Sequence, residues 1–123
     1  MTTAFWCVLV AALLPIFAVG LAKASTGFDN KAPREWLGRL GGWRARAHAA
    51  HLNSFEAFAP FAAAVIIAHL AQAPQGRVDL LAIAFIVARV AYIGLYIADL
   101  AALRSFAWMA GMGCAIALFV AAA

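Results

Sequence analysis

Charged residues are scarce in this chain of 123 residues. Only 11% of its residues are Asp, Glu, Lys or Arg, whereas a typical soluble domain has about 25%. Apolar residues make up 67% of the chain, and its mean hydropathy is +0.95. A water-soluble core cannot bury that much apolar surface. The composition therefore excludes an ordinary soluble domain and indicates a membrane protein.

Cysteine is also rare, and the chain offers no complete set of metal ligands. Cys7 and Cys114 fall inside apolar stretches without a paired spacing, so we interpret them as small buried side chains. His48 and His51 are three residues apart, but no cysteine or carboxylate is spaced to complete a metal site with them. We predict neither a disulfide nor a metal site.

Long apolar stretches make up most of the chain. A spanning helix needs about 20 mostly apolar residues, and four such stretches occur at about residues 3–22, 47–73, 78–98 and 105–122. These spans and their connections use the whole chain, so we predict a single transmembrane domain over residues 1–123. The short second and third connections favour an all-α, antiparallel four-helix bundle.

The basic residues are distributed unevenly between the connections. Six of the nine Lys and Arg residues lie within residues 23–46, Arg104 is expected in the third connection, and Arg77 lies in the second. The positive-inside rule then places the first and third connections in the cytoplasm and both termini outside. We interpret the basic run as this topology signal and expect no nucleic-acid binding. Pro33 also favours a short interfacial helix at about residues 33–40.

Two spans carry polar side chains on one face. Ionisable groups inside a membrane are costly and usually face the bundle interior. The polar residues of the second span are Arg46, Asn53, Glu56 and Pro60, and those of the third are Arg89, Tyr92, Tyr96 and Asp99. Each of these two sets falls within roughly an 80° arc of its helix.

These two polar faces allow two interpretations. In the first they pair with each other, for example Glu56 with Arg89, and fix the register of the helices at about 0.6 kcal/mol per hydrogen bond. In the second they line a pocket with cationic and anionic anchors for a ligand. We favour the pocket, because the faces hold more polar groups than a register contact needs.

The same residues carry a resemblance to a known family. Residues 46–61 read RAHAAHLNSFEAFAPF and resemble the MAPEG family, the membrane-associated proteins of eicosanoid and glutathione metabolism, through Asn53, Glu56 and Pro60-Phe61. Residues 89–96, RVAYIGLY, and 103–108, LRSFAW, are similar to its uncharacterised bacterial branch. With four spans of this size, the resemblance covers essentially the whole chain.

The resemblance implies a homotrimer in a bacterial inner membrane, with glutathione as cosubstrate between neighbouring subunits near the cytoplasm. It also implies a transferase or peroxidase, in which an arginine at the position of Arg104 stabilises the glutathione thiolate for attack on a lipophilic electrophile. The other matched positions are Asn53, Glu56, Tyr92 and Tyr96.

The chemistry of glutathione extends this set of candidate residues. Glutathione carries two carboxylates, one ammonium and a thiol. Arg46, Arg89 and Arg104 are suited to receive its carboxylates or thiolate, and Glu56 is suited to receive its ammonium. A nearby guanidinium lowers the pKa of a thiol, and the thiolate is the nucleophile.

The chain also departs from the family's characterised enzymes, which leaves alternatives open. They carry an arginine four residues before the asparagine, where this chain has Ala49. This change and the spacing of Tyr96 and Arg104 argue against eicosanoid synthesis, and leave a non-catalytic scaffold or lipid-binding member possible. A small proton-coupled exporter is a further alternative, but its membrane carboxylate would belong to the first span, which has no charge here.

Overall fold

The computed structural model describes residues 1–24 and 27–123, and this part of the chain is helical without any strand. The helices are α1 (Thr3–Lys23), α2 (Pro33–Gly38), α3 (Gly42–Leu70), α4 (Gln75–Ile97) and α5 (Ala101–Ala121). Four of them, all except α2, are long and apolar enough to cross a membrane. The prediction of an all-α protein with four transmembrane helices is therefore confirmed.

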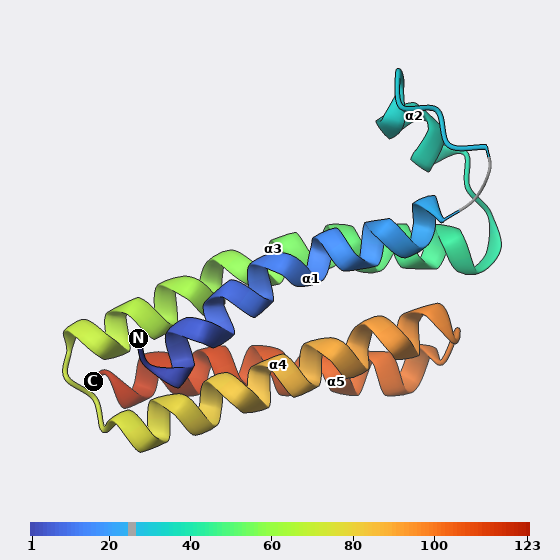
Figure 1. Cartoon of the computed structure of the whole chain (residues 1–123). Helices are drawn as coiled ribbons and strands as arrows, with labels where there is room; N and C mark the ends of the chain where they lie inside the picture. The colour runs from blue at the N-terminus through green and yellow to red at the C-terminus, as the bar shows by residue number, and fades with distance from the viewer. Residues whose placement is uncertain (25–26) are drawn as a thin grey trace.

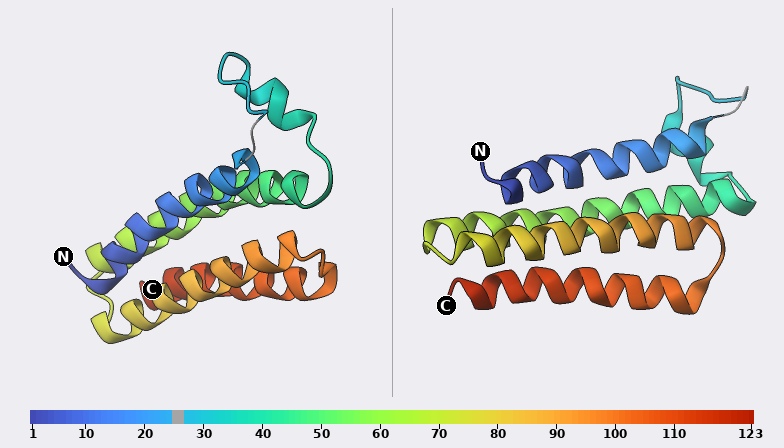
Figure 2. Two further views of the ribbon diagram at one scale, coloured as in Figure 1. Left: turned by 45° about the vertical axis from the view of Figure 1, so that its right-hand side comes forward. Right: turned by 60° about the horizontal axis from the view of Figure 1, so that its bottom comes forward.

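The four long helices pack side by side in two pairs. Helix α1 packs mainly on α3, and α4 packs mainly on α5, as Figures 1 and 2 show. Both termini lie at the same end of the bundle as the turn between α3 and α4, and α2 lies beyond the opposite end (Figure 1). Successive long helices therefore run antiparallel.

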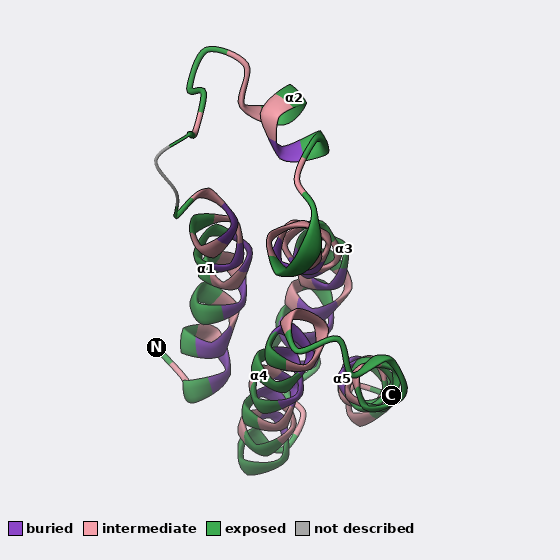
Figure 3. Ribbon diagram, turned by 90° about the vertical axis from the view of Figure 1, so that its right-hand side faces the viewer, coloured by how far each residue is buried: buried purple, intermediate pink, exposed green. Residues whose placement is uncertain are grey.

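Small side chains form the contact between α1 and α3. The buried face of α1 is turned toward α3 (Figure 3) and consists of Ala4, Cys7, Ala11, Pro15, Ala18 and Ala22. Most buried positions of α3 are also alanine. Small residues let two helix backbones approach closely inside a membrane, where van der Waals packing holds helices together.

Larger side chains fill the centre of the bundle and cover its outside. The rings of Phe61 in α3 and Phe85 in α4 stack with centroids 3.8 Å apart, and both side chains are buried. Many large apolar side chains are exposed on the outer surface, among them Phe17, Val87 and Phe106. Exposed apolar surface of this extent suits contact with lipid.

Hydrogen bonding at the helix ends holds α1 to α4. The backbone N–H of Ala4, in the first turn of α1, donates to Asp79 Oδ1 over 2.8 Å. The first four N–H groups of a helix have no partner within it, and a carboxylate is favoured at this end of the helix dipole. Asp79 of α4 therefore caps α1 from across the bundle.

Helix α3 (Gly42–Leu70) begins and ends earlier than the span expected at about residues 47–73. Two further helix ends bear on the polar residues. Helix α5 begins at Ala101, so Arg104 lies in its first turn and not in the connection, because Ala101, Ala102 and Leu103 all favour helix. Helix α4 ends at Ile97, and Asp99 follows it with φ of +62°. Aspartate tolerates this left-handed conformation, and here it leaves the polar face of α4.

The short helix α2 confirms the helix expected near residues 33–40, although it ends at Gly38. Pro33 is its first residue, where a missing N–H costs no hydrogen bond. Leu37 is buried in a small cluster with Ala22 and Ala47. This cluster ties the first connection to the ends of α1 and α3.

Candidate functional site

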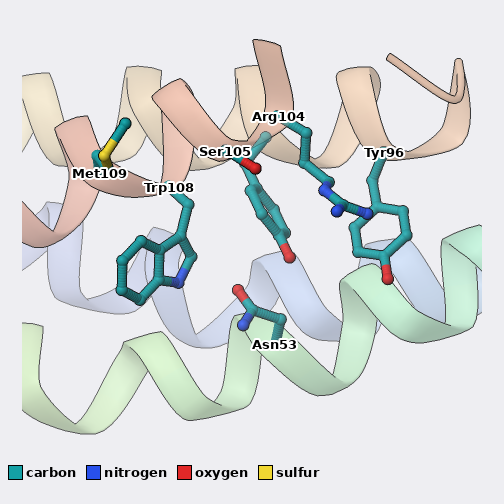
Figure 4. A pocket seen from close by; sticks show the side chains of 7 residues that line it. Asn53, Tyr96, Arg104, Ser105, Trp108 and Met109 are labelled. Carbon is teal, nitrogen blue, oxygen red and sulfur yellow. The ribbon is translucent and has the colours of Figure 1, made fainter. Parts of the chain in front are cut away.

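A cavity of about 440 Å³ opens between α3, α4 and α5 (Figure 4). Cavities of roughly 300–1,000 Å³ are of the size that holds drug-sized ligands. The side chains that line it are Asn53, Tyr92, Tyr96, Arg104, Ser105, Trp108 and Met109. In Figure 4 the Asn53 side chain reaches from α3 toward the residues of α4 and α5.

Arg104 supplies the only cation of this lining. Its guanidinium carbon lies 4.2 Å from the centroid of the Tyr96 ring, a cation–π contact that fixes the position of the charge. Across residues 1–24 and 27–123, no hydrogen bond or ion pair of this guanidinium to another residue is found. Its N–H donors therefore remain available to a ligand.

Tyr92 and Tyr96 form one wall of the cavity. They lie one helical turn apart on α4, and their rings meet edge to face with centroids 5.6 Å apart. Tyr92 is buried, whereas Tyr96 is half-buried. This contact orders both aromatic rings beside Arg104.

Arg89 is buried behind the cavity and does not line it. Only 3% of its surface is exposed. Its Nη2 donates to Asn53 Oδ1 at 3.0 Å and to Ser54 Oγ at 3.3 Å. The guanidinium also lies 4.2 Å from the centroid of the Tyr92 ring. The stem of Arg89 packs near Gly111 of α5, because a Cβ at Gly111 would lie at an ordinary van der Waals distance of 3.5 Å from Arg89 Cδ.

Asn53 connects Arg89 to Glu56. The Asn53 Nδ2 group donates to Glu56 Oε2 at 3.0 Å, while the Asn53 carbonyl oxygen accepts from Arg89. An amide therefore bridges the cation and the carboxylate, whereas one of the two interpretations of the sequence paired them directly. Glu56 itself is exposed, next to the cavity but outside its lining.

Arg46 has a different role from the one suggested by its place on the polar face. Its Nε donates to the backbone carbonyl of Ile97, the last residue of α4, at 3.0 Å. The last carbonyls of a helix lack partners within it, so Arg46 caps α4. Of the candidate site residues, the structure gathers Asn53, Tyr92, Tyr96 and Arg104 around the cavity, and leaves Arg46, Glu56 and Arg89 outside its lining.

Three residues of the lining were missed by the sequence analysis. Ser105, Trp108 and Met109 follow Arg104 on α5 and face the same cavity. Residues four apart share one face of a helix, so a helix that begins at Ala101 places Trp108 beside Arg104. The fourth span was predicted from the sequence to begin at residue 105. Arg104 then lay outside the helix, so the face that it shares with Trp108 was not recognised.

Comparison with known proteins decides the family. Residues 3–123 match the sequence model of the MAPEG family. The chain belongs to the MAPEG family. No curated protein and no solved structure matches it.

Membership confirms the resemblance carried by the polar motifs. In this MAPEG protein, the motif residues Asn53, Tyr92, Tyr96 and Arg104 meet around one cavity although they come from three helices. The residues that line this cavity include one cation and no carboxylate.

Proposed function

We propose that this MAPEG protein binds glutathione in the cavity between α3, α4 and α5 and directs its thiolate at a lipophilic electrophile. The observation that supports the proposal is Arg104, whose guanidinium is fixed over Tyr96 at 4.2 Å and lines the cavity. A cation with available donors in a partly buried site stabilises an anion far better than it would in water.

Arg104 would act on the sulfur of glutathione. A guanidinium close to a thiol lowers its pKa, so the thiol proton leaves to water and the thiolate remains. The thiolate then forms a carbon–sulfur bond with the electrophilic carbon, and the leaving group departs with its electron pair. Trp108 and Met109 are exposed apolar residues of the same lining, which suits entry of the electrophile from lipid.

The remaining polar groups would hold the tripeptide. Asn53 and the two tyrosines offer hydrogen bonds from the cavity wall. Glu56 lies beside the wall and is exposed, so it is suited to receive the glutathione ammonium. Arg89 would act on the ligand indirectly, because its hydrogen bond to Asn53 orients the amide that faces the cavity.

A homotrimer would complete this site. Glutathione has three charged groups besides its thiol, and one protomer lines the cavity with a single cation. A neighbouring subunit would supply the missing charges, in agreement with the family resemblance. The first and third connections would then face the cytoplasm, where glutathione is dissolved, and the termini would lie outside.

The test uses the purified protein in detergent. We expect each detergent particle to contain three chains of 13.0 kDa. We also expect a measurable heat of glutathione binding, and conjugation of glutathione to an electrophilic aryl halide with release of halide. An intact oligomer that neither binds glutathione nor releases halide would remove the proposal.

A non-catalytic member that binds lipid is the second candidate. Its support is Ala49, which stands where the family's characterised enzymes carry arginine. This alternative predicts an intact oligomer from which lipid is recovered but to which glutathione does not bind.

A further inference from the structure

The cavity between α3, α4 and α5 changes in character along α5. Arg104 lies in the first turn of this helix. Trp108 follows four residues later, on the same face of the helix and about 6 Å further along its axis. Met109 is the next residue and also lines the cavity. The first turn of α5 therefore supplies a cation to the lining, and the next turn supplies two large, mainly apolar side chains.

The indole N–H of Trp108 is a hydrogen-bond donor that faces the cavity. Across residues 1–24 and 27–123 it makes no hydrogen bond to another residue, and 39% of the residue is exposed. In Figure 4 the indole nitrogen lies on the edge of the ring that is turned toward Asn53. An indole N–H can donate but cannot accept. This edge of the ring therefore offers a ligand a single donor.

The other polar side chains of the lining have different partners. Ser105 Oγ donates to the backbone carbonyl of Ala101 at 3.1 Å. Arg104, Asn53 and the two tyrosines are the lining groups that we propose for glutathione. The N–H of Trp108 is thus the donor of the lining that is left for the electrophile.

The place of this donor relative to Arg104 favours one class of electrophile. Arg104 is proposed to stabilise the sulfur, and the donor belongs to a residue about one helical turn away. In an epoxide or a peroxide, the oxygen that takes up the negative charge is bonded directly to the attacked atom. In an α,β-unsaturated carbonyl compound, that oxygen lies three bonds from the attacked carbon. The separation of Arg104 and Trp108 suits the conjugated compound.

We propose that the electrophile of this MAPEG protein is an α,β-unsaturated carbonyl compound with an alkyl chain, and that the N–H of Trp108 donates to its carbonyl oxygen. This inference rests on the proposed function and names the substrate class of the same site. The alkyl chain lies along Met109, which is apolar and 51% exposed. Because both side chains line the cavity itself, a neighbouring subunit that closes the cavity leaves the assignment unchanged.

The reaction with such a compound is an addition without a leaving group. The thiolate forms a carbon–sulfur bond with the β-carbon. The π electrons of the C=C bond then form a double bond to the carbonyl carbon, and those of the C=O bond move to the oxygen. The enolate oxygen accepts the hydrogen bond from Trp108, which is stronger to a charged oxygen than to a neutral one. Water protonates the α-carbon and yields the saturated conjugate.

Two electrophiles of equal chain length test the role of Trp108. The purified protein in detergent is assayed with glutathione and either an α,β-unsaturated nonenal, followed by the loss of its conjugated absorbance, or nonyl iodide, followed by the release of iodide. Trp108→Phe keeps an aromatic ring but removes the N–H. We expect it to lower kcat for nonenal about tenfold or more, the effect of one hydrogen bond to a charged group. Its KM for nonenal and its turnover of nonyl iodide should be unchanged, because the bond strengthens only as the enolate forms.

The matched control is Trp6→Phe. Trp6 is an exposed residue near the start of α1 and does not line the cavity, so the same chemical change should leave both activities normal. The heat of glutathione binding and the thermal unfolding midpoint are measured for each variant. Both should match those of the unaltered protein.

Two outcomes would overturn this inference while the proposed function stands. One is a protein that binds glutathione and converts nonyl iodide but not nonenal. The other is an equal loss of both activities in Trp108→Phe, which would make Trp108 a structural part of the cavity wall. A protein that binds no glutathione, or conjugates it to no electrophile, would instead remove the proposed function and this inference with it.

Discussion

Two arginines in this molecule have the same aromatic contact but different surroundings. The guanidinium carbon of Arg89 lies 4.2 Å from the Tyr92 centroid, and that of Arg104 lies 4.2 Å from the Tyr96 centroid. Arg89 is buried and donates to Asn53 and Ser54. Arg104 lines a cavity and makes no such bond to a described residue.

The difference shows how a membrane protein can assign different roles to identical side chains. A buried cation is tolerated only where its hydrogen bonds are satisfied, and Arg89 meets part of this need with side chains of α3. A cation that keeps its donors for a ligand must instead face a cavity. We therefore assign Arg89 to the structure and propose Arg104 for binding and chemistry.

The largest expected effect concerns Arg104 and catalysis. In Arg104→Gln, turnover of an aryl halide should fall on the order of 10²-fold or more, as when one preorganised donor to a developing anion is removed. The unfolding midpoint should barely change, because the guanidinium of Arg104 makes no hydrogen bond to another described residue. Steady-state kinetics and thermal unfolding of one preparation measure both quantities.

The control for this variant is Arg77→Gln. Arg77 is an exposed cation in the first turn of α4, at the opposite end of the bundle from Arg104. It should retain normal turnover. Equal turnover in the Arg104 and Arg77 variants would contradict the catalytic role that distinguishes Arg104 from Arg89.

An intermediate effect is expected for Arg89 and stability. Arg89→Met keeps much of the apolar stem but removes the donor to Asn53 Oδ1 and to the buried Ser54 Oγ. A polar group left unsatisfied in a buried place costs about 1–3 kcal/mol. Unfolding in mixed detergent should show a loss of this size, with glutathione affinity reduced less than in Arg104→Gln. The opposite ranking of the two variants would mean that Arg89 contacts the ligand.

The smallest effect is the coupling between Arg89 and Asn53. A double-mutant cycle of Arg89→Met and Asn53→Leu isolates their interaction. Intramembrane hydrogen bonds average about 0.6 kcal/mol in such cycles, and we expect a coupling near this value because one bond of 3.0 Å joins the two side chains. The same cycle with Asn53 and Arg104 should give a coupling near zero.

Much of the fold could be predicted from the sequence because lipid imposes a simple requirement. A spanning helix must be long and apolar, and every backbone group must be paired within it. The end of α4 was harder to predict, since Asp99 continues the polar spacing but adopts φ of +62°. Periodicity cannot detect a single left-handed residue that ends a helix.

The candidate site could be predicted only in part. Asn53, Tyr92, Tyr96 and Arg104 were found because they match a family motif and share polar faces. Trp108 and Met109 were missed, since an apolar side chain toward a cavity and one toward lipid look alike in a sequence. Arg46 was found as a polar residue, but its bond to the Ile97 carbonyl depends on where α4 ends.

The sequence by itself determined that this protein is a membrane protein with four spanning helices. It also determined that some of these helices carry polar groups whose transfer into a membrane costs free energy. Those properties follow from the transfer of side chains between water and hydrocarbon, which depends on residue type and order. The tertiary structure decided which polar groups satisfy one another. Only the packing of α3 against α4 and α5 brings Asn53 between Arg89 and Glu56 and leaves Arg104 facing a cavity.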